Sequence, residues 1–164
     1  MRKIEIIQHK IISRTDLDRW LAIARFKNRK IVFTNGCFDV LHRGHVDYLA
    51  AASELGDLLL VGLNTDVSVR KLKGENRPYL DEETRALILA SFTYVSAVVL
   101  FHEETPYDLI RQVNPDVLVK GGDYKTEEIV GHDIVAARGG KVLSLDFTSG
   151  YSSSGVIGKI TGNP

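Results

Sequence analysis

Two histidines flank one glycine in the segment His42-Arg43-Gly44-His45, which follows an apolar run and precedes residues with helical spacing. Imidazoles can donate hydrogen bonds to phosphate oxygens, and glycine leaves space for a phosphate to approach the backbone. The free N–H groups of a helix N-terminus also favour an anion. The segment therefore predicts a phosphate site, with two loop histidines of no function as the alternative. A zinc site is disfavoured, because a histidine pair without a nearby third ligand binds zinc poorly.

The loop between the apolar run and these histidines, residues 35–41, bears on the class of ligand. It lacks the Gly-x-Gly-x-x-Gly pattern with which dinucleotide-binding loops hold a pyrophosphate, which disfavours a nicotinamide or flavin dehydrogenase. In an open parallel sheet, ligands bind outside the carboxyl ends of the strands, where the strand order reverses. We therefore expect the histidines at that edge, after the first strand.

Short apolar runs recur along the chain and predict the strands that must position this loop. They occupy residues 30–34, 58–63, 96–101, 117–119 and 141–145. The runs are continuous rather than alternating, as expected for parallel strands buried on both faces. Segments with helical spacing separate them. This alternation predicts right-handed crossovers and one doubly wound α/β domain with a five-stranded parallel sheet.

Capping residues predict where the helices between these strands begin and end. The helix after the histidines is expected to run to Gly56 as its C-cap. Its expected inner face is formed by Val46, Leu49, Ala50 and Ser53. Further helices are expected over residues 84–92, 106–113 and 127–138. Thr105 would be the N-cap of the second of these, before a first-turn proline, and Gly139-Gly140 would end the third.

An amphipathic helix is expected ahead of the first strand, over residues 15–28. Its inner face would carry Trp20, Leu21, Ile23 and Ala24. We interpret Trp20 as a residue of the core or of an interface, rather than as a platform for a ligand. The apolar face indicates a surface through which the chain could form a homodimer. We therefore divide the chain into a helical extension, residues 1–29, packed on a domain of residues 30–164.

The composition limits the class of protein further. The chain of 164 residues is long enough for one domain with a buried core. Its 21 basic residues balance its 21 acidic ones, so the net charge gives no reason to expect nucleic acid or a membrane as partner. A single cysteine excludes an internal disulfide. No apolar run approaches the roughly 20 residues that span a bilayer, and the N-terminal segment does not read as a secretory signal, so we expect a cytoplasmic protein.

Five motifs in order carry a resemblance to a known family. They are Gly36-Cys37-Phe38-Asp39 with His42-Arg43-Gly44-His45, residues 61–66, Lys73-Gly74 with Arg77-Pro78, residues 120–124, and residues 150–154. Over about residues 30–160 the chain resembles the nucleotidyltransferase superfamily with the signature His-x-Gly-His. The resemblance implies a Rossmann-like fold. It also implies a reaction that joins a nucleoside triphosphate to a phosphorylated acceptor and releases pyrophosphate.

Two runs indicate a branch of this superfamily. The sequences Leu-Lys-Gly-Glu-Asn-Arg-Pro at 72–78 and Lys-Gly-Gly-Asp-Tyr-Lys at 120–125 resemble the adenylyltransferases of ADP-heptose synthesis. Those enzymes are known as the C-terminal half of a bifunctional kinase and adenylyltransferase. The resemblance implies transfer of AMP from ATP to D-glycero-β-D-manno-heptose 1-phosphate, a sugar 1-phosphate. It also implies Mg²⁺ with the ATP, and a separate kinase that supplies the acceptor.

Two other functions stay open. Cytidylyltransferases that act on glycerol 3-phosphate or a related alcohol phosphate usually carry an arginine before the last helix, where residues 147–150 read Phe-Thr-Ser-Gly. The chain departs from the heptose pattern at Ser149, where an acidic residue is usual, and at Ser153-Ser154, which replaces a threonine pair. A nucleotide-sensing module without turnover is the non-enzyme alternative, and the intact histidine pair disfavours it.

The resemblance also implies roles for individual residues. His42, His45 and Lys73 would be catalytic, the histidines by donating hydrogen bonds to the triphosphate and the lysine by neutralising it. The nucleotide would contact Asn35, Gly36, Cys37, Phe38, Gly44, Lys120, Gly121, Gly122, Asp123, Ser152, Ser153 and Ser154. The second substrate would contact Asp39, Asn64, Asp66 and Arg77.

Several of these residues have a structural alternative. Lys73 could belong to a solvated surface loop, Asp66 could cap the next helix, and the serines could only cap the last helix. Asp39 could instead orient a histidine or hold a metal-bound water. We interpret Cys37 as a packing residue rather than a catalytic thiol, since direct displacement at phosphorus needs no protein nucleophile. No protein ligand for Mg²⁺ is predicted, because this ion commonly binds through phosphates and waters.

Overall fold

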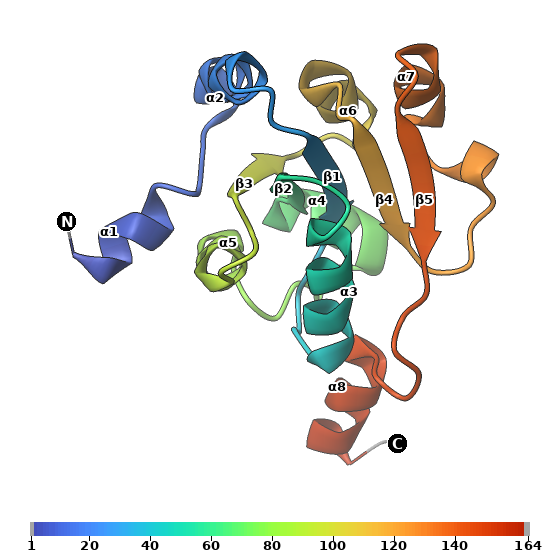
Figure 1. Cartoon of the computed structure of the whole chain (residues 1–164). Coiled ribbons are helices and arrows are strands. Elements are labelled where there is room, and N and C mark those ends of the chain that lie inside the picture. Colours follow the sequence, from blue (N-terminus) through green and yellow to red (C-terminus); the bar gives the residue numbers. More distant parts are fainter. Residues whose placement is uncertain (1, 163–164) are drawn as a thin grey trace.

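The apolar runs form a single parallel sheet in the computed structural model, which describes residues 2–162 (Figure 1). Its strands are β1 (Ile31–Gly36), β2 (Leu58–Asn64), β3 (Ala97–Phe101), β4 (Val117–Gly121) and β5 (Lys141–Leu145). They lie in the order β3-β2-β1-β4-β5, and each neighbouring pair is parallel. The order reverses between β1 and β4, so the switch point lies at the carboxyl ends of these two strands. The prediction of a doubly wound, five-stranded parallel sheet is confirmed.

Helices cover both faces of the sheet and pack on alternate residues of the same strands. Helices α2 (Arg14–Phe26), α6 (Tyr107–Val113) and α7 (His132–Ala137) lie on one face, drawn at the top of Figure 1. Helices α3 (Arg43–Ser53) and α5 (Glu82–Ser91) lie on the other. Phe33 of β1 joins the first core, whereas its neighbour Val32 joins the second. Since consecutive strand residues point to opposite faces, a strand buried on both faces is apolar throughout.

The other helices are α1 (Lys3–Gln8), α4 (Asp66–Lys73), the short 3₁₀ helix η1 (Thr126–Glu128) and α8 (Ser153–Thr161). The sequence analysis did not predict α1 and α4. Helix α1 packs beside α5, and α4 leads from the end of β2 into the loop before α5. Within residues 2–162, the structure has no helix that is both long and apolar enough to cross a membrane.

The inner face expected for α3 is confirmed in part: Leu49 is buried, and Ala50 and Ser53 are half-buried. Its buried side chains are Tyr48, Leu49 and Ala52. Val46, predicted on the inner face, is 38% exposed. Gly56 is not the C-cap, because the helix ends at Ser53 with Glu54 as its cap. An added Cβ at Gly56 would lie 2.9 Å from the carbonyl oxygen of Lys30, so this glycine permits a close approach of two backbones.

Residues 127–138 do not form the single helix that was expected. Gly131 has φ +85°, a conformation that side chains other than glycine rarely adopt, and it separates η1 from α7. Gly139 and Gly140 follow the end of α7, as predicted. Thr105 is not the N-cap of α6, because that helix begins after Pro106 without a side-chain cap.

Helix α2 ties the N-terminal segment to the sheet. Its buried side chains are Leu17, Leu21 and Ala24. They lie in the same core as Phe33, with Trp20 partly buried against it. The prediction of Ile23 on this face is wrong, because its side chain is 48% exposed. Upstream of α2, the backbone N–H of Ile12 donates to the carbonyl of Val98 at 2.9 Å. A homodimer through the α2 surface stays a prediction.

Replacing Leu21 with alanine tests whether α2 is part of this core. The side chain is 1% exposed, so its truncation should lower the free energy of unfolding by about 2–5 kcal/mol. Urea titration followed by far-ultraviolet circular dichroism measures the change. Ile23→Ala, on the exposed side of the same helix, is the matched control and should lower the free energy by less than about 1 kcal/mol. Equal losses at the two positions would contradict the packing of α2.

Candidate active site

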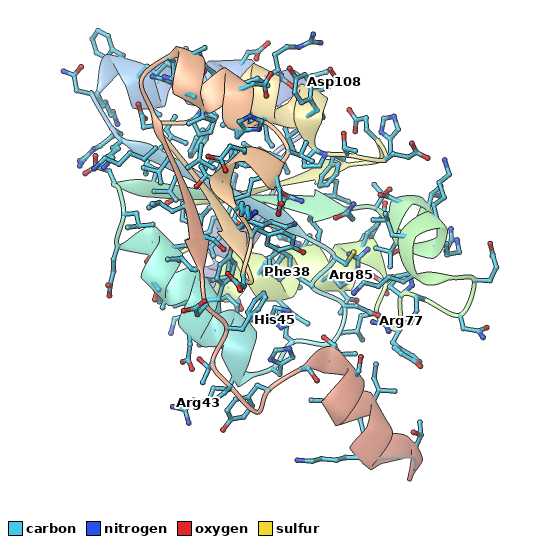
Figure 2. All side chains as sticks on the ribbon, turned by 90° about the vertical axis from the view of Figure 1, so that its right-hand side faces the viewer. Phe38, Arg43, His45, Arg77, Arg85 and Asp108 are labelled. Atoms are coloured by element: carbon cyan, nitrogen blue, oxygen red, sulfur yellow. The ribbon has the colours of Figure 1, made fainter. Side chains whose placement is uncertain are left out.

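The chain turns sharply at the end of β1 and delivers the histidines to the start of α3. Phe38 is buried and has φ +44°, an uncommon backbone conformation for a large side chain. Its ring lies against Gly36, where an added Cβ would meet it at 3.0 Å. The ring also contacts His45 edge to face, with centroids 5.5 Å apart, and Figure 2 shows the two side chains next to each other. Packing of Phe38 therefore fixes the loop that carries the histidine pair.

The two histidines cap α3 reciprocally. The N–H of Gly44 donates to Nδ1 of His42 at 3.1 Å, and the N–H of His42 donates to Nδ1 of His45 at 3.4 Å. The ring centroids are 4.0 Å apart. Because both Nδ1 atoms accept a hydrogen bond, each neutral imidazole carries its proton on Nε2 and presents that N–H as a donor. An added Cβ at Gly44 would lie 2.9 Å from the ring of His42, so the pair requires glycine between its members.

Burial keeps both rings neutral. It lowers the pKa of His42, and it lowers the pKa of His45 to about 4, where the charges of His42 and Lys73 act in the same direction. An imidazole with such a pKa is uncharged at neutral pH. The pair therefore offers two hydrogen-bond donors without adding two positive charges.

A cavity of about 360 Å³ opens in front of the histidine loop at the switch point. It is lined by Asn35, Gly36, Cys37, Phe38, Asp39, His45, Tyr48, Lys73, Lys120, Gly121, Tyr124, Phe147 and Ser153. The structure thus brings together residues from all the sequence motifs except the one at 61–66. A larger hollow of about 880 Å³ lies between α1, α4 and α5, and its acidic lining, which includes Asp81, Glu82 and Glu83, is unsuited to phosphate.

Two lysines give this cavity its charge. Lys120 ends the buried part of β4, and burial lowers the pKa of its ammonium group. Lys73 is the last residue of α4. It is exposed to solvent and also lines the cavity. Within residues 2–162 neither lysine forms an ion pair. Both charges are therefore available to a bound anion.

Aromatic side chains that the sequence analysis did not select complete the wall of the cavity. The ring of Phe147 lies directly against Gly121, so that no side chain could replace this glycine without a clash. It also lies 5.5 Å from the ring of Tyr48, whose hydroxyl pairs with Thr34 at 2.6 Å. Gly122 has φ +114° and turns the chain toward Tyr124. Asp123 is exposed and lies outside this lining.

The serines at the start of α8 hold this helix against the histidine loop. Ser152 is the N-cap and accepts from the N–H of Gly155 at 3.0 Å, so the expected capping role is confirmed. The hydroxyl of Ser153 donates to the carbonyl of Val40 at 3.1 Å and lines the cavity. Ser154 is exposed in the first turn. Contact of any of the three serines with a nucleotide stays a prediction.

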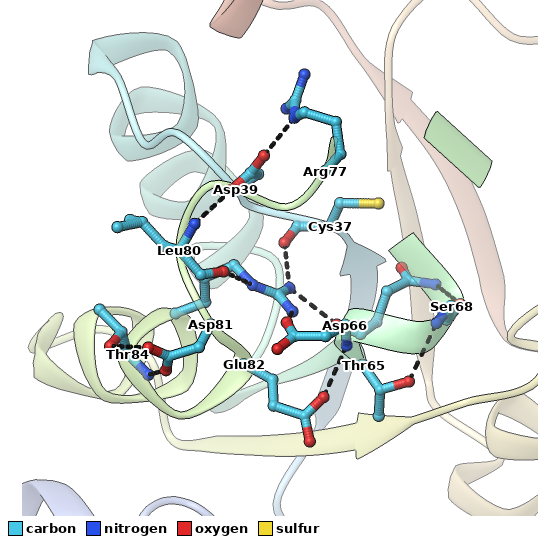
Figure 3. A network of polar contacts seen from close by, with 12 residues as sticks. Cys37, Asp39, Thr65, Asp66, Ser68, Arg77, Leu80, Asp81, Glu82 and Thr84 are labelled. Carbon is cyan, nitrogen blue, oxygen red and sulfur yellow. Dashed lines mark hydrogen bonds and ion pairs between the residues drawn. The ribbon is translucent and has the colours of Figure 1, made fainter. Parts of the chain in front are cut away.

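A buried arginine that the sequence analysis missed joins the loops around the cavity, and Figure 3 labels its partners Cys37, Asp66 and Leu80. Arg85 of α5 is 0% exposed. Its guanidinium donates to the carbonyls of Leu80 at 2.9 Å, Cys37 at 2.7 Å and Asn64 at 2.8 Å. It also pairs with the carboxylate of Asp66 at 2.7 Å. A charged residue in a helix usually faces solvent, so the sequence carried no signal for this position.

The polar side chains expected to contact a second substrate are engaged within the protein. Asp39 is buried and accepts from the Arg77 guanidinium at 2.6 Å and from the N–H groups of Tyr79 and Leu80 at 2.7 and 3.1 Å. Burial acts to raise the pKa of Asp39, but these hydrogen bonds outweigh it and lower the pKa. Arg77 also carries a buried Nη2 atom that has no hydrogen-bond partner within the described residues.

The other two expected contacts lie at the end of β2. The side-chain amide of Asn64 donates to Ser68 at 2.8 Å and is buried. Asp66 is not the cap of α4, because Thr65 fills that position and Asp66 pairs with Arg85. Neither residue lines the cavity. Their contact with a substrate stays a prediction.

Replacing Arg85 with methionine would leave the carboxylate of Asp66 and three carbonyl oxygens without their donor. Because three carbonyls and the partly exposed carboxylate of Asp66 lose their donor together, the free energy of unfolding should fall by about 3–5 kcal/mol, measured by urea titration. Arg111→Met breaks an exposed pair with Asp108 and should cost less than about 1 kcal/mol. If the free energy of unfolding fell no more at Arg85 than at Arg111, Arg85 would not hold the loops of the site together.

The pKa of His45 can be followed through its ring protons by NMR. In the folded protein the signal should move only as the pH falls toward about 4, whereas in urea it should move near the ordinary 6.5. Between these values the unfolded chain binds the proton and the folded chain does not, so stability is lost as the pH falls through this window. A folded-state midpoint near 6.5 would contradict the burial of the ring.

Comparison with known proteins assigns the chain to a family. The family model described as cytidylyltransferase-like matches residues 33–159, which include the sheet from β1 onward, the histidine pair and most of α8. The "Bifunctional protein HldE" of Wolinella succinogenes is 53% identical over 156 residues, covering 95% of this chain and 32% of that protein. The protein of the same name from Citrifermentans bemidjiense is 57% identical over 141 residues, covering 85% of this chain and 29% of that protein.

A solved structure agrees with this assignment. The crystal structure of the lipopolysaccharide core biosynthesis protein from Thermoplasma volcanium superposes with a TM-score of 0.60 at 29% identity, covering 76% of this chain and 99% of that one. The chain spans about a third of the length of the bifunctional relatives. The family match covers the parts of the fold that form the cavity, and the chain belongs to the cytidylyltransferase-like family.

Proposed function

We propose that this chain is a nucleotidyltransferase that transfers AMP from ATP to D-glycero-β-D-manno-heptose 1-phosphate, giving ADP-heptose and pyrophosphate. The observation that carries the proposal is the histidine pair at the start of α3: His45 lines a cavity together with Lys73 and Lys120, and His42 caps the helix directly beside it. Neutral donors next to fixed cations suit a triphosphate, because they stabilise the charge that develops at the reacting phosphate.

The reaction needs positioning and charge stabilisation rather than a protein nucleophile. An oxygen of the acceptor phosphate forms a bond to the α-phosphorus of ATP. The bond from that phosphorus to the oxygen bridging the α- and β-phosphates breaks, and pyrophosphate leaves with the electron pair. Lys73 and Lys120 neutralise the phosphates, and the histidine pair donates hydrogen bonds to the oxygens of the α-phosphate. We expect the free N–H groups at the start of α8 to bind the departing phosphates.

The adenosine part fits the opposite wall of the cavity. The rings of Phe147 and Tyr124 and the backbone of Gly121 present flat surfaces, which suit a purine ring. The names of the relatives support a sugar-phosphate acceptor, since one concerns lipopolysaccharide core biosynthesis. A kinase that supplies the sugar 1-phosphate stays a prediction from the resemblance.

Mg²⁺ would accompany ATP rather than sit in a dedicated protein site. The carboxylate that lines the cavity belongs to Asp39 and is already hydrogen-bonded to Arg77, Tyr79 and Leu80. Within residues 2–162, no three histidine, cysteine or acidic side chains are grouped so as to hold a metal ion. We expect the ion to be held by phosphate oxygens and water, as is common for Mg²⁺, and to screen the charge of the triphosphate. Since ATP is the donor, we place the reaction in the cytoplasm.

Pyrophosphate release identifies the substrates directly. ATP, CTP, GTP and UTP, each with Mg²⁺, would be tested with heptose 1-phosphate, with glycerol 3-phosphate and without acceptor. We expect turnover with ATP and heptose 1-phosphate only. Turnover with CTP and glycerol 3-phosphate would instead identify the chain as a cytidylyltransferase of the glycerol 3-phosphate type. Nucleotide binding without turnover in any combination would favour a sensor.

The variant His42→Asn separates the catalytic role of this histidine from its capping role. Asparagine also accepts a hydrogen bond at an N-cap, so α3 should stay folded, but the variant lacks the Nε2–H donor. We expect kcat to fall by about 100-fold or more at unchanged thermal stability. His102→Asn, at an exposed position outside the cavity, is the control and should keep wild-type activity. A fully active His42→Asn variant would contradict the donor role.

A further inference from the structure

A second, smaller cavity adjoins the first across the switch point. Its volume is about 140 Å³, and it shares Asn35, Lys120 and Tyr124 with the larger cavity. The rest of its lining comes from two places. Pro106 lies at the start of α6, and Glu128 and Val130 lie at the end of η1 and just after it. Helix α6 and Ile129 belong to the core on the α2 face of the sheet, whereas the histidine pair lies toward the α3 face. The tips of β1 and β4 therefore separate two cavities that open on opposite sides of the sheet.

The two cavities differ in the chemistry of their walls. The larger one combines His45, a serine hydroxyl and two lysines, which suit a polyanion. The smaller one is lined by Glu128 beside the shared Lys120, so a carboxylate there offsets the lysine charge and makes this cavity less suited to a triphosphate. Within residues 2–162 this carboxylate has no ion-pair partner, and its residue is exposed. A carboxylate is a strong acceptor for hydroxyl groups, and Pro106 and Val130 add an apolar surface beside it.

We propose that the smaller cavity binds the sugar ring of the acceptor, with Glu128 accepting hydrogen bonds from the ring hydroxyls. Pro106 and Val130 contact the C–H face of the ring. The acceptor phosphate then points to Lys120, which lines both cavities and so lies where the phosphates of the two substrates meet. This inference rests on the proposed adenylyl transfer and specifies the side of the sheet from which the acceptor enters. The reaction is unchanged: the acceptor phosphate oxygen bonds to the α-phosphorus of ATP, and pyrophosphate leaves.

Glu128→Gln tests the assignment, because it removes the negative charge and keeps the size of the side chain. We expect the KM for heptose 1-phosphate to rise by about tenfold or more, with the KM for ATP changed by less than about twofold. Glu127→Gln, the neighbouring exposed residue of η1, removes the same charge outside the cavity and should change neither KM. Initial rates of pyrophosphate release measure both constants.

Two outcomes would overturn the inference. If Glu128→Gln raises the KM for ATP alone, the smaller cavity binds the nucleoside instead. If neither KM changes, the sugar ring binds outside this cavity. If wild-type protein transfers no nucleotide to any acceptor, the proposed function fails, and the cavity is then tested by calorimetric titration with heptose 1-phosphate. Binding to wild type that Glu128→Gln weakens by about tenfold would still support the site. The absence of binding to wild type would overturn it.

Discussion

The buried ion pair of Arg85 with Asp66 is the interaction on which the site depends. A guanidinium that is 0% exposed is costly to bury unless its N–H groups are satisfied, and here three carbonyls and one carboxylate satisfy them. Those acceptors come from the loop after β1, the end of β2, the start of α4 and the segment before α5. Because the cost of an unpaired donor is high, these segments are held in one arrangement relative to one another.

The same arrangement fixes the histidine pair. The carbonyl of Cys37 belongs to the loop that carries His42, and Asp39 in this loop accepts from Arg77 and from the backbone after it. From the opposite side, Ser153 of α8 donates to the carbonyl of Val40. The loop between β1 and α3 is thus hydrogen-bonded to α5, to the segment before α5 and to α8. With the loop fixed, the two rings can cap α3 reciprocally and present their donors without reorganisation when a substrate binds.

The sheet and the place of the site follow from local patterns, whereas the network around the site does not. Continuous apolar runs such as residues 58–63 identify strands buried on both faces, and a glycine between two histidines predicts a phosphate site at the switch point. Arg85 could not be recognised, because its partners come together only in the folded chain. Helical spacing also misassigned Val46 to the core of α3, since a helix this short offers two apolar faces of similar strength. The break at Gly131 depends on packing against Ile110, which the local sequence does not specify.

The ion pairs of Arg77 with Asp39 and of Arg85 with Asp66 also explain how a chain with no net charge can form an anion site. Asp39 and Asp66 lie beside the cavity or its supporting loops, and an arginine neutralises each of them. Lys73 and Lys120 have no such partner within residues 2–162, so the local balance at the larger cavity is positive. Neutral histidines add donors there without adding like charges that would repel the lysines. Glu128 lies on the other side of the switch point, where its carboxylate offsets the charge of the shared Lys120, so the smaller cavity has no net charge whereas the larger one is positive. A triphosphate and a polyhydroxylated sugar are distinguished by such a difference, since the first requires cations and the second requires hydrogen-bond acceptors.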